Sequence, residues 1–168
     1  MIMIEQKIEK IIIDAISAAF AAANVSGIQV VGAWQPATVD EIKAARDRKA
    51  RGLLSIKVAP RAHDTFTIAE ASFTVSATLD VRAEMDAAGI GYLEVTDVVS
   101  GVIYPWQKKF SNYADAFTVA GEFDPTGFRL DGGDCGLDVG NGAWTWRQDF
   151  TIQGIIKNGG GTNNVLQS

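Results

Sequence analysis

The side chains with the greatest chemical potential in this chain are its one histidine, His63, and its one cysteine, Cys135. Together with Asp64, these residue types could form a cysteine hydrolase, in which an imidazole at hydrogen-bond distance activates a thiol. A histidine in a turn after Pro60 is more often a polar loop residue, and a cysteine among glycines is more often a small, half-buried side chain. We therefore predict that the chain is not an enzyme, and keep a small hydrolase or ligand-binding domain as the alternative.

A second candidate site is the segment 127–142, where aspartates alternate with glycines. Calcium-binding nonapeptide repeats have a similar composition, but such sites need stacked copies to complete their cage of oxygen ligands, and this chain has one. No predicted strand followed by a helix frames the glycines, so nucleotide binding lacks its usual context. Two carboxylates could also act as acid and base, yet such segments commonly turn for backbone reasons. We expect β-hairpin turns here, with no metal or cofactor; the aspartates concerned are Asp124, Asp131, Asp134 and Asp138.

Charge is distributed unevenly along the chain. Its net charge of −5 argues against strong non-specific attraction to nucleic acid. Residues 43–61 nevertheless contain seven basic side chains and one acidic one, Asp47. The charged residues of 115–138 are mainly acidic. The basic residues are Lys43, Arg46, Arg48, Lys49, Arg51, Lys57 and Arg61.

Two solvated faces would explain this pattern without any partner. The alternative hypothesis is that the basic face of one subunit meets the acidic face of the next, because such head-to-tail contacts generate rings. A third possibility is a nucleic-acid-binding module that uses residues 43–51 as a phosphate-contacting helix.

Four tryptophans could serve either the core or an interface. Core packing is the simpler expectation, but large aromatic side chains also supply much of the energy where proteins meet. Trp34 and Trp106 stand beside or near prolines at the ends of predicted elements, so we expect these two to be exposed. The interface hypothesis therefore comprises Trp34, Arg46, Arg48, Lys49, Arg51, Trp106, Asp131 and Asp134.

Residues 71–85 alternate apolar and polar side chains without interruption, which predicts a β-strand. A strand of this length could reach about 50 Å, so one end is expected to project from a small domain and offer itself to a partner. The phase of alternation differs between Ile68 and Ala71, which predicts a bulge or turn at Ala69 and Glu70.

Apolar residues at steps of three and four predict two main helices, at 2–23 and at 92–106, the second with Leu93 on its apolar face and ended by Pro105. The first carries Glu5, Glu9 and Asp14, so we expect a packed helix and neither an export signal nor a membrane span. A short basic helix is expected at 38–45. Further strands are expected at 28–34, 54–58, 117–119, 128–130 and 143–156.

These elements predict an α+β fold, a mostly antiparallel sheet with a long bulged strand and two main helices packed on it. We expect one domain over residues 1–157 and a flexible, Gly- and Asn-rich C-terminal tail at 158–168. The single cysteine cannot form an internal disulfide and suits a reducing compartment.

The order of these segments resembles that of tail terminator or tail completion proteins of tailed phages and prophages. The resemblance extends to about Lys157 and is one of layout, carried by the leading amphipathic helix, by "FTVSATLDVRAEM", by "VVSGVIYPW" and by "WTWRQDFTIQGII". It implies a structural subunit that forms a ring, commonly a hexamer, at the head-proximal end of the tail tube and joins the tube to the head connector.

The resemblance also implies the partners and the location. They would be further copies of the chain, the tail tube protein and the head connector protein, in the virion tail or the cytoplasm of a bacterial host, with no membrane, no cofactor and no catalytic residue. Another phage neck or head–tail joining protein is the alternative within the same class.

Overall fold

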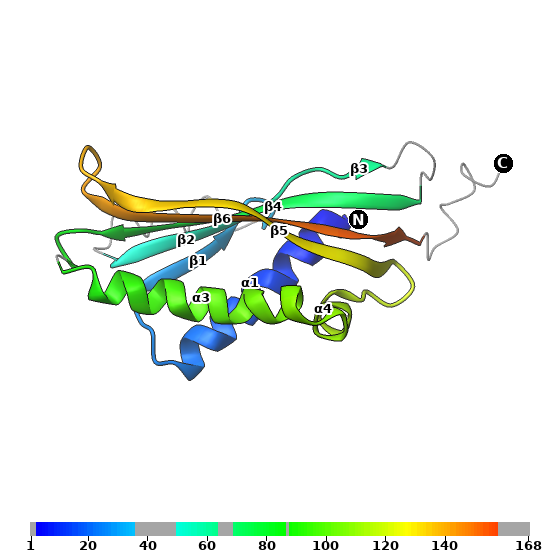
Figure 1. Cartoon of the computed structure of the whole chain (residues 1–168), viewed down its shortest axis with the longest axis horizontal. Coiled ribbons are helices and arrows are strands. Elements are labelled where there is room, and N and C mark those ends of the chain that lie inside the picture. Colours follow the sequence, from blue (N-terminus) through cyan, green and yellow to red (C-terminus); the bar gives the residue numbers. More distant parts are fainter. Residues whose placement is uncertain (1–2, 36–49, 64–68, 87, 158–168) are drawn as a thin grey trace.

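The computed structural model describes residues 3–35, 50–63, 69–86 and 88–157. Helices pack on one face of a six-stranded sheet whose main strand order is β1-β2-β4-β6-β5, while β3 pairs with β4. Most pairs are antiparallel, which confirms the predicted α+β class (Figure 1). In chain order the elements are α1 (Ile4–Ala22), β1 (Ile28–Gly32), β2 (Gly52–Val58), β3 (Ala62–His63), β4 (Glu70–Arg82), α3 (Ile90–Lys108), α4 (Phe110–Phe117), β5 (Phe123–Asp138) and β6 (Ala143–Ile156). The helix expected at 38–45 and the tail at 158–168 lie outside the described residues.

The long alternating strand is β4, and it forms the centre of the sheet. It pairs with β6 along its whole length, while its other edge pairs with β2 and β3. The expectation that this strand projects toward a partner is therefore wrong, because neighbouring strands satisfy its backbone on both sides. The long strand at the edge of the sheet is instead β5, with 16 residues.

The turn, one of the two alternatives predicted at Ala69 and Glu70, is confirmed, because Ala69 lies in a turn that leads into β4. β4 keeps one continuous register with β2 and with β6, so it has no bulge. β3 runs antiparallel to β4, so the chain reverses direction between the two strands; residues 64–68 lie outside the described part. The irregular pairings are in β5, between Pro125 and Gly127 and between Leu130 and Gly133.

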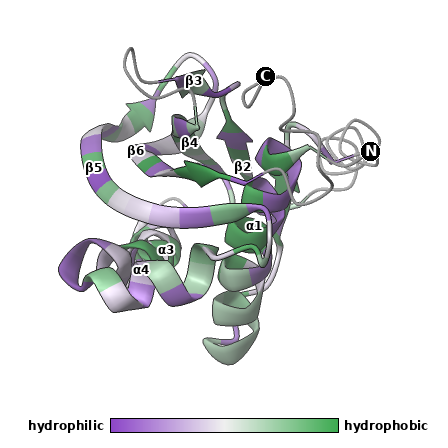
Figure 2. Cartoon of the chain, turned by 90° about the vertical axis from the view of Figure 1, so that its right-hand side faces the viewer, coloured by the Kyte–Doolittle hydropathy of each residue, from purple (hydrophilic) through white to green (hydrophobic). Residues whose placement is uncertain are grey.

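Figure 2 shows α1, α3 and α4 gathered below the sheet. One side of α1 is buried at every fourth residue, so it presents a continuous apolar stripe to β1, β2 and α3. The face of β4 formed by its odd-numbered residues, from Ala71 to Val81, is buried against the helices, as a strand with period two requires. The largest fully buried side chains are Tyr113, Phe73, Phe117, Phe123, Phe150, Ile8, Ile12, Ile16, Leu54, Ile56, Leu79 and Ile152.

Two local predictions differ from the structure. Pro105 lies inside α3, which continues to Lys108. The proline removes one helical hydrogen bond, but the acceptor four residues earlier belongs to the exposed Gly101, where water can replace the donor. The strand expected at 117–119 is wrong as well: Phe117 ends α4, and Val119 forms only an isolated bridge with Phe123.

Glu9 is a fully buried charged residue on the apolar face of α1. Its Oε1 accepts a hydrogen bond from the backbone N–H of Trp34 at 2.8 Å, and its Oε2 accepts one from the N–H of Val58 at 3.3 Å. The amide of Gln35 adds a third contact at 3.4 Å. The carboxylate therefore joins α1 to Trp34, just after β1, and to Val58, the last residue of β2. Among the described residues, no neighbouring strand accepts hydrogen bonds from these two backbone N–H groups, so the carboxylate satisfies them.

Gly32 leaves the space that this carboxylate occupies. A Cβ at Gly32 would lie 2.2 Å from Glu9 Oε1 and 2.6 Å from the Cδ1 atom of Ile13. A side chain larger than hydrogen at this position must therefore displace α1 from the sheet or break the hydrogen bonds of Glu9.

We predict that Gly32→Ala lowers the free energy of unfolding by about 1–3 kcal/mol, the usual cost of overpacking a dense core. Urea denaturation followed by tryptophan fluorescence measures this change. Gly101→Ala is the matched control: a Cβ there meets nothing within 4 Å, so removing a helical glycine should stabilise the protein by up to about 1 kcal/mol. Equal stability of Gly32→Ala and the wild type would contradict the role assigned to Glu9.

Candidate functional site

The structure does not bring the predicted hydrolase residues together. His63 is exposed on β3 and pairs with Ala71 of β4, whereas Cys135 pairs with Trp146 of β6, which in turn faces Leu79 of β4. Ala71 and Leu79 are eight residues apart on one strand, roughly 27 Å. Asp64 lies outside the described residues.

The aspartates of β5 each have a separate local role. Asp124 forms an ion pair with Lys157 at 2.7 Å, and Asp134 accepts a hydrogen bond from the backbone N–H of Cys135 at 2.9 Å. Asp138 accepts hydrogen bonds from Asn141, which closes the turn of the β5–β6 hairpin. Among the described residues, no group of three or more His, Cys, Asp or Glu side chains could hold a metal ion.

Asp131 and Asp80 have perturbed carboxyl groups. A 2.6 Å hydrogen bond from the hydroxyl of Thr151 lowers the pKa of Asp131; partial burial opposes this, and Arg129 adds to the lowering. Burial raises the pKa of Asp80, and the negative charge of Asp138 raises it further. Asp131 is thus a structural acceptor paired with Arg129, while Asp134 remains an exposed candidate for a partner contact.

The exposure predicted for Trp106 is wrong. Its side chain is buried and packs edge-on against Phe117, with ring centroids 4.7 Å apart, and close to Phe128 and Phe150. Because α3 continues through Pro105, Trp106 falls on the same buried helix face as Ile103. Trp34 is 38 % exposed, and its indole N–H donates to the carbonyl of Val58, so its ring is held in place at the surface.

The basic part of the predicted interface is described only at Arg51. Arg46, Arg48 and Lys49 lie outside the described residues. The guanidinium of Arg51 lies against the first turn of α3: a Cβ at Gly91 would come within 1.6 Å of Arg51 Nη2. Arg51 is therefore packed within its own subunit.

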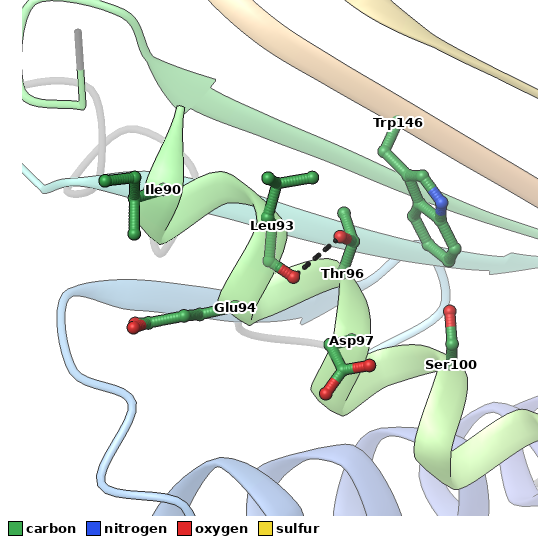
Figure 3. Close-up of a pocket in the computed structure, with 7 residues that line it drawn as sticks. All are labelled: Ile90, Leu93, Glu94, Thr96, Asp97, Ser100 and Trp146. Atoms are coloured by element: carbon green, nitrogen blue, oxygen red, sulfur yellow. Dashed lines mark hydrogen bonds between the residues drawn. The ribbon is translucent and has the colours of Figure 1, made fainter. Parts of the chain in front are cut away.

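An open groove lies between α3 and the sheet, with a volume of about 600 Å³. Figure 3 shows that the indole of Trp146 extends from β6 toward α3. Ile90 and Leu93 are each 63 % exposed, and the acidic side chains of Glu94 and Asp97 lie beside them. We call this the α3–Trp146 groove; its lining is Ile90, Leu93, Glu94, Thr96, Asp97, Ser100 and Trp146.

The groove exists because the helical layer is incomplete. α4 packs against β5, but residues 132–137 of that strand are exposed on both faces. Cys135 and Leu137 lie opposite Trp146 and Trp144, so they share the face of the sheet that the helices cover elsewhere. Leu137 is 46 % exposed and Val139, in the hairpin turn, is 83 % exposed. Apolar surface is thus left open beside α3.

Sequence reasoning missed this groove because it placed Leu93 on the buried face of the helix. The buried face in fact runs through Tyr92, Val95 and Val99. A signal was present: Ile90 and Leu93 lie three residues apart, and Asp97 follows four residues later, so a second stripe exists on the opposite side of the helix.

No family model matches this chain, and no curated protein matches it. Among the helices of the described residues, none is long and apolar enough to cross a membrane.

A partly buried ion pair fixes the N-terminal part of α1 to the connection between β2 and β3. The Arg61 side chain binds both carboxylate oxygens of Glu5, at 2.7 and 3.1 Å, and its backbone N–H donates to the same carboxylate at 3.1 Å. Burial raises the pKa of Glu5, but the hydrogen bonds from Arg61 lower it by more, so the net pKa lies below its ordinary value of 4.5. Folding therefore favours the ionised form.

This pair predicts a pH dependence of stability. A carboxyl whose pKa is depressed by folding stabilises the protein above its unfolded pKa, and this contribution is lost as the pH falls through the folded pKa. Glu5→Gln should lower the free energy of unfolding by about 1–2 kcal/mol at pH 7, and its difference from the wild type should shrink below about pH 4.5.

Urea denaturation at pH 7 and at pH 3 measures the effect. Asp14→Asn is the matched control on the same helix, because the Lys10–Asp14 pair is 65 % and 62 % exposed and should contribute less than about 0.5 kcal/mol. A constant difference between Glu5→Gln and the wild type at both pH values would contradict the assignment.

Proposed function

We propose that this chain is a structural subunit of a phage or prophage tail, a tail terminator or completion protein that forms a ring at the head-proximal end of the tail tube. The proposal combines the layout resemblance of the sequence with the surfaces of the folded subunit. The ring would end the growth of the tube and present a surface to the head connector.

The observation that carries this proposal is the exposed half of the β5–β6 hairpin. β5 is a sixteen-residue edge strand with no strand partner on its outer side among the described residues. A long open edge beside an uncovered apolar face is a liability for an isolated subunit, and natural proteins usually cover such surfaces by assembly or by charge.

The distribution of charge supports a head-to-tail contact between subunits. The acidic β5 lies at one edge of the sheet, whereas β1 and β2, which flank the basic residues 43–49, lie at the other edge. An acidic edge strand and a basic segment that joins β1 to β2 favour the association of unlike surfaces, and such contacts close into rings when the rotation between copies allows it.

The position of the hydrolase candidates favours assembly over catalysis. His63 and Cys135 lie on different strands and at different ends of β4, so the pair required for thiol activation is not formed within one subunit.

Light scattering coupled to gel filtration, together with electron microscopy, tests this function. We expect concentration-dependent multimers of the purified chain, six copies in the simplest case, and binding of these multimers to one end of tubes formed by the cognate tail tube protein. Charge reversal within residues 43–49 by Arg46→Glu and Arg48→Glu should raise the protein concentration needed for half-maximal assembly at least tenfold. Lys10→Glu, a reversal of an exposed charge on α1 outside residues 43–61, should change assembly less than twofold.

The proposal would be refuted if the protein were strictly monomeric and did not bind the tube protein. Retention on DNA that weakens steeply with salt, without any assembly, would instead favour the nucleic-acid-binding alternative.

A further inference from the structure

We propose that the α3–Trp146 groove is the site where a second copy of this chain docks, through the basic segment 43–49 of that copy. This inference rests on the proposed assembly function and names the contact that would form it.

The shape of the groove suits a helix. Ile90 and Ser100 are separated by about 15 Å along α3, which corresponds to nearly three helical turns. The side wall is the exposed stripe of α3, and the roof is the sheet at Trp146. An added helix would fill the place next to α3 that the subunit's own helical layer leaves open, and amphipathic helices bind grooves of this kind through their apolar side.

The charge of the groove selects a basic partner. Glu94 and Asp97 line it, and α3 contains no basic residue before Lys108. The segment that begins at Thr38 has two acidic residues, Asp40 and Glu41, at its start and basic residues with alanines after them, and its sequence predicts a helix. Its basic residues outnumber its acidic ones from position 43 onward: Lys43, Arg46, Arg48 and Lys49 stand against Asp47.

The topology favours a contact between copies. The basic segment joins β1, at one edge of the sheet, to β2, whereas the groove lies under β6 beside β5. β1 and β5 are opposite edges of the sheet, which favours a contact of this segment with another copy over one with the groove of its own chain. The resulting contact is head-to-tail, as a ring requires.

The native Cys135 allows a direct test by cross-linking. This exposed cysteine lies opposite Trp146 on the groove side of the sheet and is the sole thiol of the chain. In Ala45→Cys, mild oxidation with diamide, which accepts the two electrons and two protons released by two thiols, should join neighbouring copies. Non-reducing gels should show a ladder of covalent multimers that dithiothreitol abolishes.

Two controls define the specificity of the cross-link. Ala45→Cys combined with Cys135→Ser should give no ladder beyond a dimer, because each copy then has one thiol. Lys57→Cys places an exposed thiol on β2, outside residues 43–49, and should cross-link at least fivefold less. A fast-migrating monomer would show that the segment binds the groove of its own chain, and this result or the absence of any adduct would overturn the proposal.

A second pair of variants tests the groove itself. Leu93→Asp changes an exposed side chain in the groove, so folding should be preserved, and the concentration for half-maximal assembly should rise at least tenfold. Tyr104→Asp is the matched control on the same helix, 58 % exposed and outside the groove, with an expected change below twofold. Glu94→Lys with Asp97→Lys should also weaken assembly, and Arg46→Glu with Arg48→Glu should restore it.

The outcomes separate the two proposals. If the wild type forms multimers that bind the tube while Leu93→Asp behaves like Tyr104→Asp, the groove proposal fails and the assembly function stands. If the wild type neither assembles nor binds tubes, the proposed function fails.

Discussion

The buried carboxylate of Glu9 is the interaction on which the arrangement of helices and sheet depends. It accepts backbone hydrogen bonds from Trp34 and Val58, so one side chain of α1 satisfies donors at the ends of two strands. A buried charge is tolerated only when such donors surround it, which restricts α1 to one position. α3 packs on α1, and the groove is bounded by α3 and Trp146, so the open surface of the subunit follows indirectly from this contact.

The regular part of the fold could be predicted from sequence because its signals are local. β4 has one buried face, so its side chains alternate, and α1 has one buried stripe, so its isoleucines recur every fourth residue. Strand order depends on pairing between distant segments: β4 joins β6 more than sixty residues later. The alternation of β4 therefore revealed its existence but not its central position.

The exposed surface around α3 and β5 was harder to predict, because it depends on how distant segments pack together. Trp106 stands after Pro105, which usually ends a helix, yet the helix continues and turns the indole into the core. β5 is rich in glycine, which has no side chain to show a pattern, so its length was underestimated. Leu93 is apolar but faces outward, because the packing of α3 on the sheet is decided by Val95 and Val99. Clusters of charge were visible in the sequence, but the position of the acidic cluster on the edge strand β5 required the topology.

The acidic composition of β5 has a consequence for the behaviour of the free subunit. Two copies that approached each other through their open β5 edges would bring acidic strands together, including Asp134 and Asp138, which form no ion pair among the described residues. Repulsion between like charges disfavours this symmetrical pairing. The two register shifts in β5 also make its edge irregular, so a second strand can pair with it less well. The carboxylates thus protect the free subunit from aggregation through its open strand edge. Their protection fades in solutions near the isoelectric point of about 4.8, where the molecule loses its net charge and precipitation through exposed strand edges becomes favourable.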